Sequence, residues 1–497
     1  MTNVNDERLG RRTFLKQMAT VAGTAPLAPA FLGAGAASAQ TPAAAPKQET
    51  AHETERLAAY AAKLRYEDLP DAVVQRAKDC IIDGFATISY GPELPWSKMI
   101  IAHAQRYGAG GKSAILGVSG SNVHAPAAAL ANGALAHAFE LDSTTKPDSG
   151  AHPAASLFTS GLAVAQERGY GGRALITAMV AGAEVMLRIG HATKHSNETR
   201  GFHAPGTTSP FGAAVAAGHL QGFDAGKMTN ALGIAGSCSA GLLQFADAGN
   251  GAMVKRLHLG RGAESGVLAA SLAEQGFTGP SSVVEGKFGF LRVFCNEYDM
   301  AELTRGLGST FFTMDTLLKP YATHGTAQVP VEATLSLRDE YKFTAADVAS
   351  IAIACNGRMA ERNNIAAPDD KMMAQYSVPF CVALSLYRDA RDPRSFDDEV
   401  IHDRPILDLT ARTKLTAVPG QGGTDDTSTV TIRLKDGREL SRKMTNYKGT
   451  PDRPFNRADL QEKFLLLTRH LDRGRMEAMF DRLERIENEP SLDWVRA

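Results

Sequence analysis

The sequence predicts a mainly α protein: a large all-helical domain, built from N- and C-terminal segments, with a smaller α+β lid domain inserted into it. Runs rich in Ala and Gly, with apolar residues at helical spacing, dominate from residue 53 to about 294. After about Thr313, β-branched runs typical of strands stand among helical segments. We expect a helical domain over 53–312, a lid over 313–454, and C-terminal helices over 455–497 that return to the helical domain.

The clearest helix of the first half is expected over Asp71–Tyr90, where Val73, Ile81 and Phe85 share one apolar face. Pro70 before it and Gly91 after it are typical helix boundaries. The high Ala and Gly content predicts closely packed helices, none of them long and apolar enough to span a membrane. Similar runs cover Ala127–Phe139, Ala174–Ile189, Pro210–Gln221, Thr229–Phe245 and Gly262–Gln275.

The second half mixes strands and helices. Val348–Cys355 and Thr427–Leu434 are rich in β-branched residues and predict strands. Asp436-Gly437 predicts a tight turn between the second strand and Glu439–Lys443. Helical patterns cover Val329–Leu337, Met373–Tyr387 and the C-terminal stretch Asn456–Ile486.

The first 39 residues resemble a twin-arginine export signal, followed by a flexible linker over 40–52. Arg11-Arg12 precedes Phe14-Leu15-Lys16 and a short apolar stretch, and Ala37-Ser38-Ala39 supplies small residues at a cleavage position. An ordinary secretory signal or a basic tail remains an alternative. We expect a periplasmic protein without stable membrane insertion after signal cleavage.

Composition narrows the possible partners. The 497 residues carry a formal net charge of −1 with no basic stripe, which argues against nucleic-acid binding. The five cysteines are far apart and lack zinc or iron–sulfur spacing. His191 and His195 have i,i+4 spacing but no HExxH glutamate, so we expect no metal site there.

Four polar clusters stand at the ends of apolar runs and predict one positively charged pocket. Such a pocket suits a small polycarboxylate, and histidines of near-neutral pKa suit proton transfer. A Gly- and Thr-rich turn that opens a helix also offers backbone N–H groups to an anion. The clusters are His137–His152 (with Glu140, Asp142, Thr144 and Lys146), Gly201–Thr208 (with His203), Lys255–Arg261 (with Arg256 and His258) and Lys319–His324.

These clusters carry a family resemblance. NGALAHAFELDSTTKPDSGAHP (132–153), GFHAPGT (201–207), VKRLHLGRGAESG (254–266), EGKFGFLRVF (285–294) and KPYATHGTA (319–327) stand in this order. Together they resemble the MmgE/PrpD family of 2-methylcitrate dehydratases and cis-aconitate decarboxylases. The resemblance covers roughly residues 53–487 and implies a homodimeric lyase, with a helical domain, an α+β lid and no required cofactor.

The resemblance also implies roles for individual residues. We expect His203, His152, Glu140 and Lys255 to be catalytic. Substrate binding is expected of Thr144, Arg256, His258, Lys319 and His324. Three positions depart from the family pattern: Glu140 replaces an aspartate, Ser143 replaces the second aspartate of an acidic pair, and Phe380 falls where the family often has tyrosine.

The leading hypothesis is therefore a lyase that dehydrates or decarboxylates a small di- or tricarboxylate. An isomerase or epimerase that uses the same base is an alternative within enzymes. A periplasmic polycarboxylate-binding protein without turnover is the alternative outside them.

Overall fold

The structure is a computed structural model that describes residues 52–247 and 252–496. The predicted export signal and nearly all of the predicted linker lie outside these residues. Within them the chain is mainly helical, as predicted, with one four-stranded sheet and two short strand pairs.

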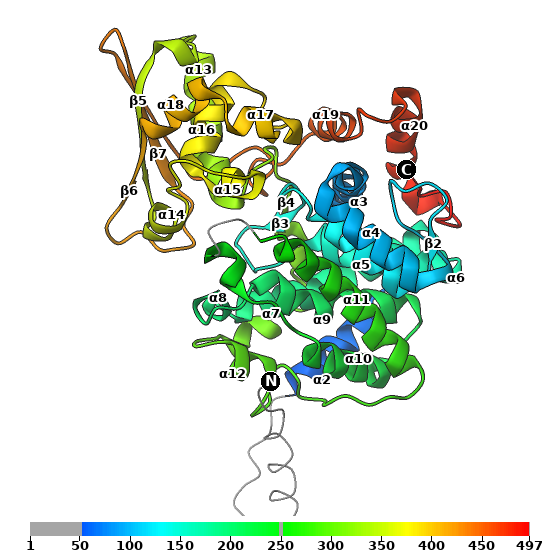
Figure 1. The fold of residues 1–497 in the computed structure, drawn as a ribbon. Helices are drawn as coiled ribbons and strands as arrows, with labels where there is room; N and C mark the ends of the chain where they lie inside the picture. The colour runs from blue at the N-terminus through cyan, green and yellow to red at the C-terminus, as the bar shows by residue number, and fades with distance from the viewer. Residues whose placement is uncertain (1–51, 248–251, 497) are drawn as a thin grey trace, which may run out of the picture. The chain divides into compact units, whose positions relative to one another are not determined.

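Five long helices form the core that positions the site (Figure 1). Close packing follows from small residues at the crossings, as expected. A Cβ at Gly260 would lie 2.3 Å from the Leu130 carbonyl oxygen, and one at Gly266 would lie 2.3 Å from the Ala213 Cβ. The helices are α3 (Asp71–Tyr90), α5 (Ala125–Ala136), α7 (Gly172–Ala192), α9 (Ala204–Leu220) and α11 (Val254–Glu274).

Other elements surround this core. The helices are α2 (Glu53–Lys63), α4 (Pro95–Gly108), α6 (Thr159–Arg168), α8 (Ser196–Thr199), α10 (Ala225–Ser237) and α12 (Phe290–Phe294). The short strands are β1 (Ala109–Ala114), β2 (Asn122–Val123), β3 (Thr144–Thr145) and β4 (Thr316–Leu317).

Several helix boundaries differ from the prediction, and three of them bear on the site. α10 ends at Ser237 rather than Phe245, and Phe245 lies in a separate 3-10 turn, Leu243–Asp247. α9 begins at Ala204 because Pro205 is accepted in a first helical turn. α11 begins at Val254, so the cationic cluster lies inside the helix rather than before it.

One core helix reaches membrane-spanning length and apolarity, contrary to the prediction. This is α7, Gly172–Ala192, and 89% of its most apolar window is buried inside the protein. Burial of this kind is what the central helix of a packed core requires.

The predicted strands of the second half are confirmed. β5 (Val348–Cys355), β7 (Ser428–Leu434) and β8 (Glu439–Met444) join β6 (Thr413–Ala417), which was not predicted, in the order β6-β5-β7-β8. β6 is parallel to β5 and the other pairs are antiparallel. Gly437, with φ 93°, makes the predicted turn between β7 and β8.

Helices gather beside this sheet (Figure 1). They are α13 (Gln328–Tyr341), α14 (Gly357–Arg362), α15 (Lys371–Tyr376), α16 (Val378–Tyr387), α17 (Asp398–Ile401) and α18 (Arg404–Ala411). The expected single helix over Met373–Tyr387 is wrong. Ser377 separates α15 from α16, because its extended backbone and its side chain cap the second helix.

The C-terminal helices contact the helical core. α19 (Arg457–Leu467) lies against α3, where the rings of Phe464 and Phe85 stack with centroids 5.7 Å apart. Lys463 of α19 pairs with buried Asp83 and donates to the Leu141 carbonyl 2.9 Å away. α20 (Arg473–Leu483) follows, with Phe480 against Phe464.

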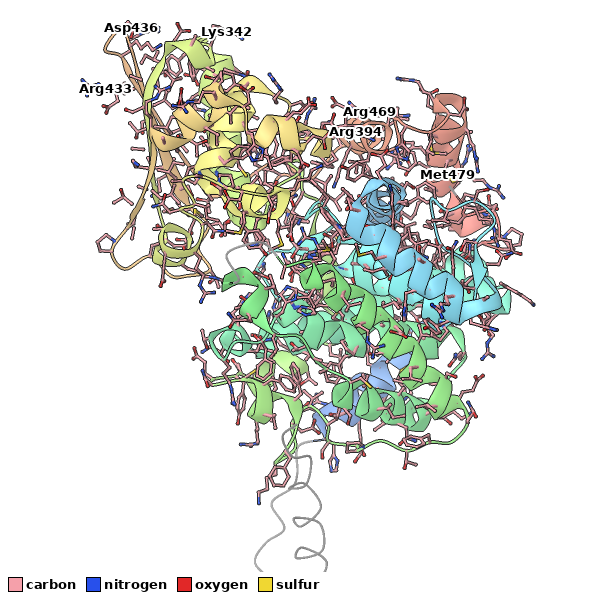
Figure 2. All side chains as sticks on the ribbon, viewed as in Figure 1. Lys342, Arg394, Arg433, Asp436, Arg469 and Met479 are labelled. Carbon is pink, nitrogen blue, oxygen red and sulfur yellow. The ribbon has the colours of Figure 1, made fainter. Side chains whose placement is uncertain are left out.

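A surface ion cluster joins the end of α19 to the segment that follows α16. Arg394 and Arg469, both labelled in Figure 2, pair with Asp392 at 3.4 and 2.6 Å. Arg394 also lies 3.2 Å from Glu93. A network that shares carboxylates in this way holds the two segments together better than an isolated surface pair.

Two structural devices bring Lys319 to the first polar cluster. Strand β3 pairs with β4, with Thr144 opposite Leu317. In addition, the Glu184 carboxylate of α7 accepts a 2.8 Å hydrogen bond from the Thr313 N–H, and buried Arg188 donates to the Thr310 carbonyl. The chain that leads into β4 is thereby fixed on the helical core.

Candidate active site

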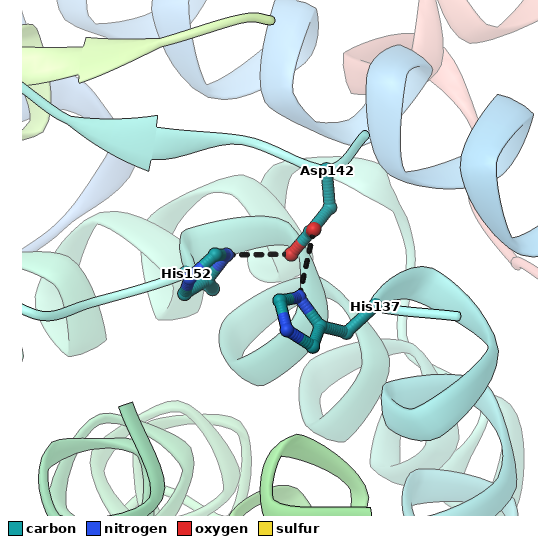
Figure 3. Close-up of side chains that lie close together, drawn as sticks. All are labelled: His137, Asp142 and His152. Carbon is teal, nitrogen blue, oxygen red and sulfur yellow. Dashed lines mark hydrogen bonds and ion pairs between the residues drawn. The ribbon is translucent and has the colours of Figure 1, made fainter. Parts of the chain in front are cut away.

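Asp142 joins two histidines at the centre of the first cluster (Figure 3). One carboxylate oxygen accepts from His137 Nδ1 at 2.9 Å and the other from His152 Nδ1 at 2.8 Å. Burial alone would raise the pKa of Asp142, but His152 and His137 outweigh it and hold that pKa well below its ordinary value. Asp142 is therefore ionised, and both histidines use Nδ1–H as donors.

This arrangement fixes the ring nitrogens available for chemistry. With Nδ1 protonated, the Nε2 atom of each neutral ring is left as an acceptor. His137 Nε2 is buried, lies 3.5 Å from the Glu140 Oε1 atom, and has no hydrogen-bond partner among the described residues. Burial lowers the pKa of His137 to about 4, against the opposing effect of Asp142. His152 is half-buried, which leaves it the more accessible base of the two.

Glu140 is held by two lysines. Its carboxylate pairs with the Lys255 ammonium, and its backbone carbonyl accepts from Lys319. Burial would raise the pKa of Glu140, but Lys255, His137 and Lys319 together lower it well below the ordinary value. Lys319 also lies 4.0 Å from Asp142, so it bridges both acids of the motif.

The backbone of Glu140 is strained. Its φ is 58°, in the left-handed region that a residue with a side chain adopts at a cost of about 1–3 kcal/mol. The strained turn aims the carbonyl of Glu140 at Lys319 while the side chain reaches Lys255. A residue that is 1% exposed keeps such a conformation only because its surroundings hold it.

A second histidine pair contains no carboxylate. His203, the residue before α9, lies with its Nδ1 3.0 Å from Nδ1 of His258, which α11 carries. Burial, with Lys255 and His258 close by, holds the pKa of His203 well below its ordinary value. Burial and Lys255 also lower the pKa of His258 to about 4. Both rings are neutral at pH 7, so one Nδ1 donates and the other accepts.

Phe245 connects this pair to the lysine. Its ring meets the His203 ring edge-on at 5.0 Å, and the Lys255 ammonium lies 5.8 Å from its centre. Phe245 and His258 also line a cavity of about 500 Å³, so a small molecule can approach this side of the pair. The cavity is bordered by Gly206, Cys238, Gly241, Leu242, Val254 and Arg261 as well.

His324 and Tyr376 add a third group. Their rings lie 4.3 Å apart, and the Lys255 ammonium lies 4.9 Å from the centre of the Tyr376 ring. Burial and Lys255 lower the pKa of His324 to about 3, so its ring is neutral. Its Nδ1 lies 2.9 Å from the Thr326 hydroxyl.

Arg256 is a buried cation without a carboxylate partner in the described residues. It is 2% exposed, contacts the Met372 sulfur, and lies over the Trp96 ring at 5.2 Å. Its Nε donates to the Ala138 carbonyl at 3.4 Å, and its Nη2 has no hydrogen-bond partner in the described part of the chain. An unpaired charge in the interior is costly, so this guanidinium calls for an anion.

The structure brings most of the predicted site residues together. One polar network contains Glu140, Lys255, Lys319 and His152. Lys255 also links this network to three further histidines, because its charge lowers the pKa values of His203, His258 and His324. Thr144 lies beside it in β3, but its hydroxyl donates to the Ala151 carbonyl at 3.0 Å.

The i,i+4 histidine pair is not a helical metal site. α7 ends at Ala192, so His195 lies outside the helix with φ 59°. His191 lies 4.0 Å from Asp315, whereas His195 lies 3.3 Å from Asp148. The ligand atoms of His137, Asp142 and His152 lie within 4.8 Å of one another and could hold a metal ion, although their observed contacts are hydrogen bonds.

Two features were missed from the sequence. The first is Tyr376, which ends a helix that was expected to continue. The second is Gln375, whose Nε2 donates to the Phe139 carbonyl at 2.8 Å and to the Ala322 carbonyl at 3.0 Å. The only local signal was a Gln-Tyr-Ser break in an apolar run.

Phe380 is fully buried, with its ring 6.1 Å from that of Phe396. All five cysteines are unpaired.

Comparison with known proteins identifies the family. The sequence model of the MmgE/PrpD N-terminal domain matches residues 55–303, and that of the MmgE/PrpD C-terminal domain matches residues 321–485. The chain belongs to the MmgE/PrpD family. The resemblance seen in the motifs is thus confirmed over most of the chain.

Several curated relatives are cis-aconitate decarboxylases. One from Aspergillus terreus is 31% identical over 300 residues, which is 58% of this chain and 60% of that protein. The mouse protein is 24% identical over 452 residues, 88% of this chain and 91% of its own length. The human protein is 25% identical over 426 residues, 83% of this chain and 86% of its own length. The chain thus spans 60% of the length of the Aspergillus terreus relatives that it matches.

Proposed function

We propose that this protein is a lyase that dehydrates or decarboxylates a small di- or tricarboxylate. The observation that carries the proposal is a surplus of buried positive charge. Lys255 pairs with Glu140 and Lys319 lies 4.0 Å from Asp142, whereas Arg256 pairs with no carboxylate among the described residues. A substrate carboxylate would complete this charge balance with charge-assisted hydrogen bonds.

His152 is the proposed base. Its Nδ1–H is fixed by Asp142, so Nε2 can accept a proton, and the Asp142 charge stabilises the imidazolium that forms. His203 is proposed as a second proton-transfer residue, since its ring is neutral and lies beside the cavity wall at Phe245. Glu140 keeps Lys255 charged and aimed into the site.

Binding is assigned to the remaining cations and polar groups. Lys319 and Arg256 would hold carboxylates, while Lys255 would stabilise the negative charge that develops on the substrate in the transition state. Thr144, His258 and His324 would complete the pocket from three different segments. We further propose that the α+β part acts as a lid over this site.

The relatives support this assignment without choosing between its two reactions. Their names describe decarboxylation of cis-aconitate. Identities of 24–31% do not separate a decarboxylase from a 2-methylcitrate dehydratase.

One experiment separates the candidate functions. The purified protein is incubated with a panel of di- and tricarboxylates in deuterated water, and products are followed by NMR. Carbon dioxide or an unsaturated elimination product supports the lyase. Deuterium uptake without either product replaces it with an isomerase or epimerase, and binding without exchange or product replaces it with a binding protein.

Export and assembly are separate proposals. We propose twin-arginine export to the periplasm, on the strength of Arg11-Arg12. Changing both residues to lysine should leave the precursor in the cytoplasmic fraction. We also propose a homodimer, which light scattering of the mature protein would test; a monomeric mass would contradict it.

A further inference from the structure

Tyr376 occupies a central place among the charged groups of the site. It is the last residue of α15, and its ring lies 4.3 Å from the His324 ring and 4.9 Å from the Lys255 ammonium. Glu140 and Arg256 are close enough to affect its ionisation. None of the described residues hydrogen bonds with its hydroxyl, whereas Lys255, Lys319 and His324 Nδ1 all have hydrogen-bond partners.

The segment around Tyr376 is firmly held. Gln375, the preceding residue, donates to carbonyls of both the acidic motif and the chain after Lys319. Its own carbonyl accepts from the His324 N–H at 3.1 Å. Ser377, the following residue, donates to the Ile365 carbonyl at 2.5 Å and accepts from the Phe380 N–H at 3.0 Å. Ordering on both sides fixes the ring beside His324 and Lys255 and leaves its hydroxyl without a partner among the described residues.

The described groups around Tyr376 are less suited to donate a proton, which leaves His203 the accepting role in proton transfer. His203, His258 and His324 are neutral at pH 7, because burial lowers their pKa values. Lys255 is committed to Glu140 and Lys319 to the Glu140 carbonyl. Burial, reinforced by Glu140, raises the pKa of Tyr376 well above its ordinary value, so the phenol keeps its proton until the reaction draws on it.

We propose that Tyr376 is a catalytic acid, whose phenol delivers a proton to the reacting end of the substrate. The proposal rests on the lyase function proposed above. Tyr376 is not the position at which the family often carries tyrosine. That position is Phe380, which lies in the core and has no hydroxyl.

The proton balance can be written for both reactions. In a decarboxylation the carbon–carbon bond to one carboxylate breaks, carbon dioxide leaves, and the electron pair left on carbon takes the phenol proton. In a dehydration His152 Nε2 takes the carbon-bound proton, the carbon–oxygen bond breaks, and the departing hydroxide takes the phenol proton to leave as water. The phenolate, stabilised by the neighbouring Lys255 ammonium, regains a proton from solvent in the first case and, through solvent, from the His152 imidazolium in the second.

The test compares Tyr376→Phe with the wild type and with a matched control, Tyr387→Phe, which removes a hydroxyl from the end of the next helix. We expect Tyr376→Phe to lose about 100-fold or more in kcat, with KM and the thermal midpoint little changed. Tyr387→Phe should keep the wild-type rate.

A second readout separates a proton donor from a structural ring. Replacing Tyr376 by a difluorotyrosine, whose phenol is more acidic, should move the basic limb of the kcat profile to lower pH; an unmoved limb would overturn the donor role. A Tyr376→Phe rate within about threefold of wild type would do the same. Failure of the parent function looks different, because the wild type itself would then form no product.

Discussion

The site contains two histidine pairs that differ in one respect: a carboxylate joins His137 to His152, whereas His203 and His258 meet directly. In the first pair Asp142 sets both tautomers and stabilises any imidazolium that forms. In the second pair the proton on one Nδ1 can be on either ring, and no carboxylate among the described residues pairs with them to favour protonation. The carboxylate therefore prepares His152, the more exposed ring of the first pair, to accept a proton, whereas the second pair consists of two neutral rings, and His258 borders the cavity.

The largest expected effect comes from Asp142→Asn. An amide can accept from only one of the two Nδ1–H groups, and its NH₂ forces the other histidine to move its proton to Nε2. If that histidine is His152, the base is lost, and we expect kcat to fall by about 10³-fold or more. Steady-state kinetics on the identified substrate measure it. A loss below about tenfold would mean that the carboxylate does not set the tautomer of the base.

A smaller effect is expected from His258→Gln. The amide can still hydrogen bond to His203, so the pair keeps a neutral polar partner. We expect about a tenfold loss in kcat/KM, mostly through KM, since His258 borders the cavity. Equal losses for His258→Gln and Asp142→Asn would remove the distinction between the two pairs.

The smallest effect concerns stability in acid. Burial and Lys255 lower the pKa of His258 from 6.5 to about 4. The unfolded chain binds this proton near pH 6.5 and the folded chain only near pH 4, so stability falls as the pH drops through that window. His258→Gln removes this contribution, and its free energy of unfolding in urea should decline less steeply from pH 7 to pH 4. A decline as steep as that of the wild type would show that His258 is not held neutral by the fold.

The sequence predicted the helices and the grouping of the charged residues better than the geometry that joins them. Apolar spacing located α3 and α7, and the motifs led to Glu140, Lys255 and Lys319. The bridging role of Asp142 depends on side-chain directions that only the folded loop defines. β6 was missed because Thr413–Ala417 is short and half-exposed, so its pairing with β5 decides its conformation.

The break at Ser377 explains why the sequence did not indicate a site role for Tyr376. Met373–Tyr387 is apolar enough to suggest one helix, and the cap that ends it depends on contacts with residues distant in sequence, such as the Ile365 carbonyl. Local propensity was overruled by tertiary hydrogen bonds. The twin-arginine signal remains a prediction, since it lies outside the described residues.

The glycines of α11 have a consequence for how this site can change. Lys255, Arg256 and His258 all project from the first turns of this helix, and Gly260 and Gly266 leave no room for a side chain against α5 and α9. Any larger residue there would displace both cations and His258 at once. New substrate preferences within this scaffold should therefore arise through the segments that face α11, such as the one carrying Met372 and Tyr376, while the helix itself stays invariant under selection.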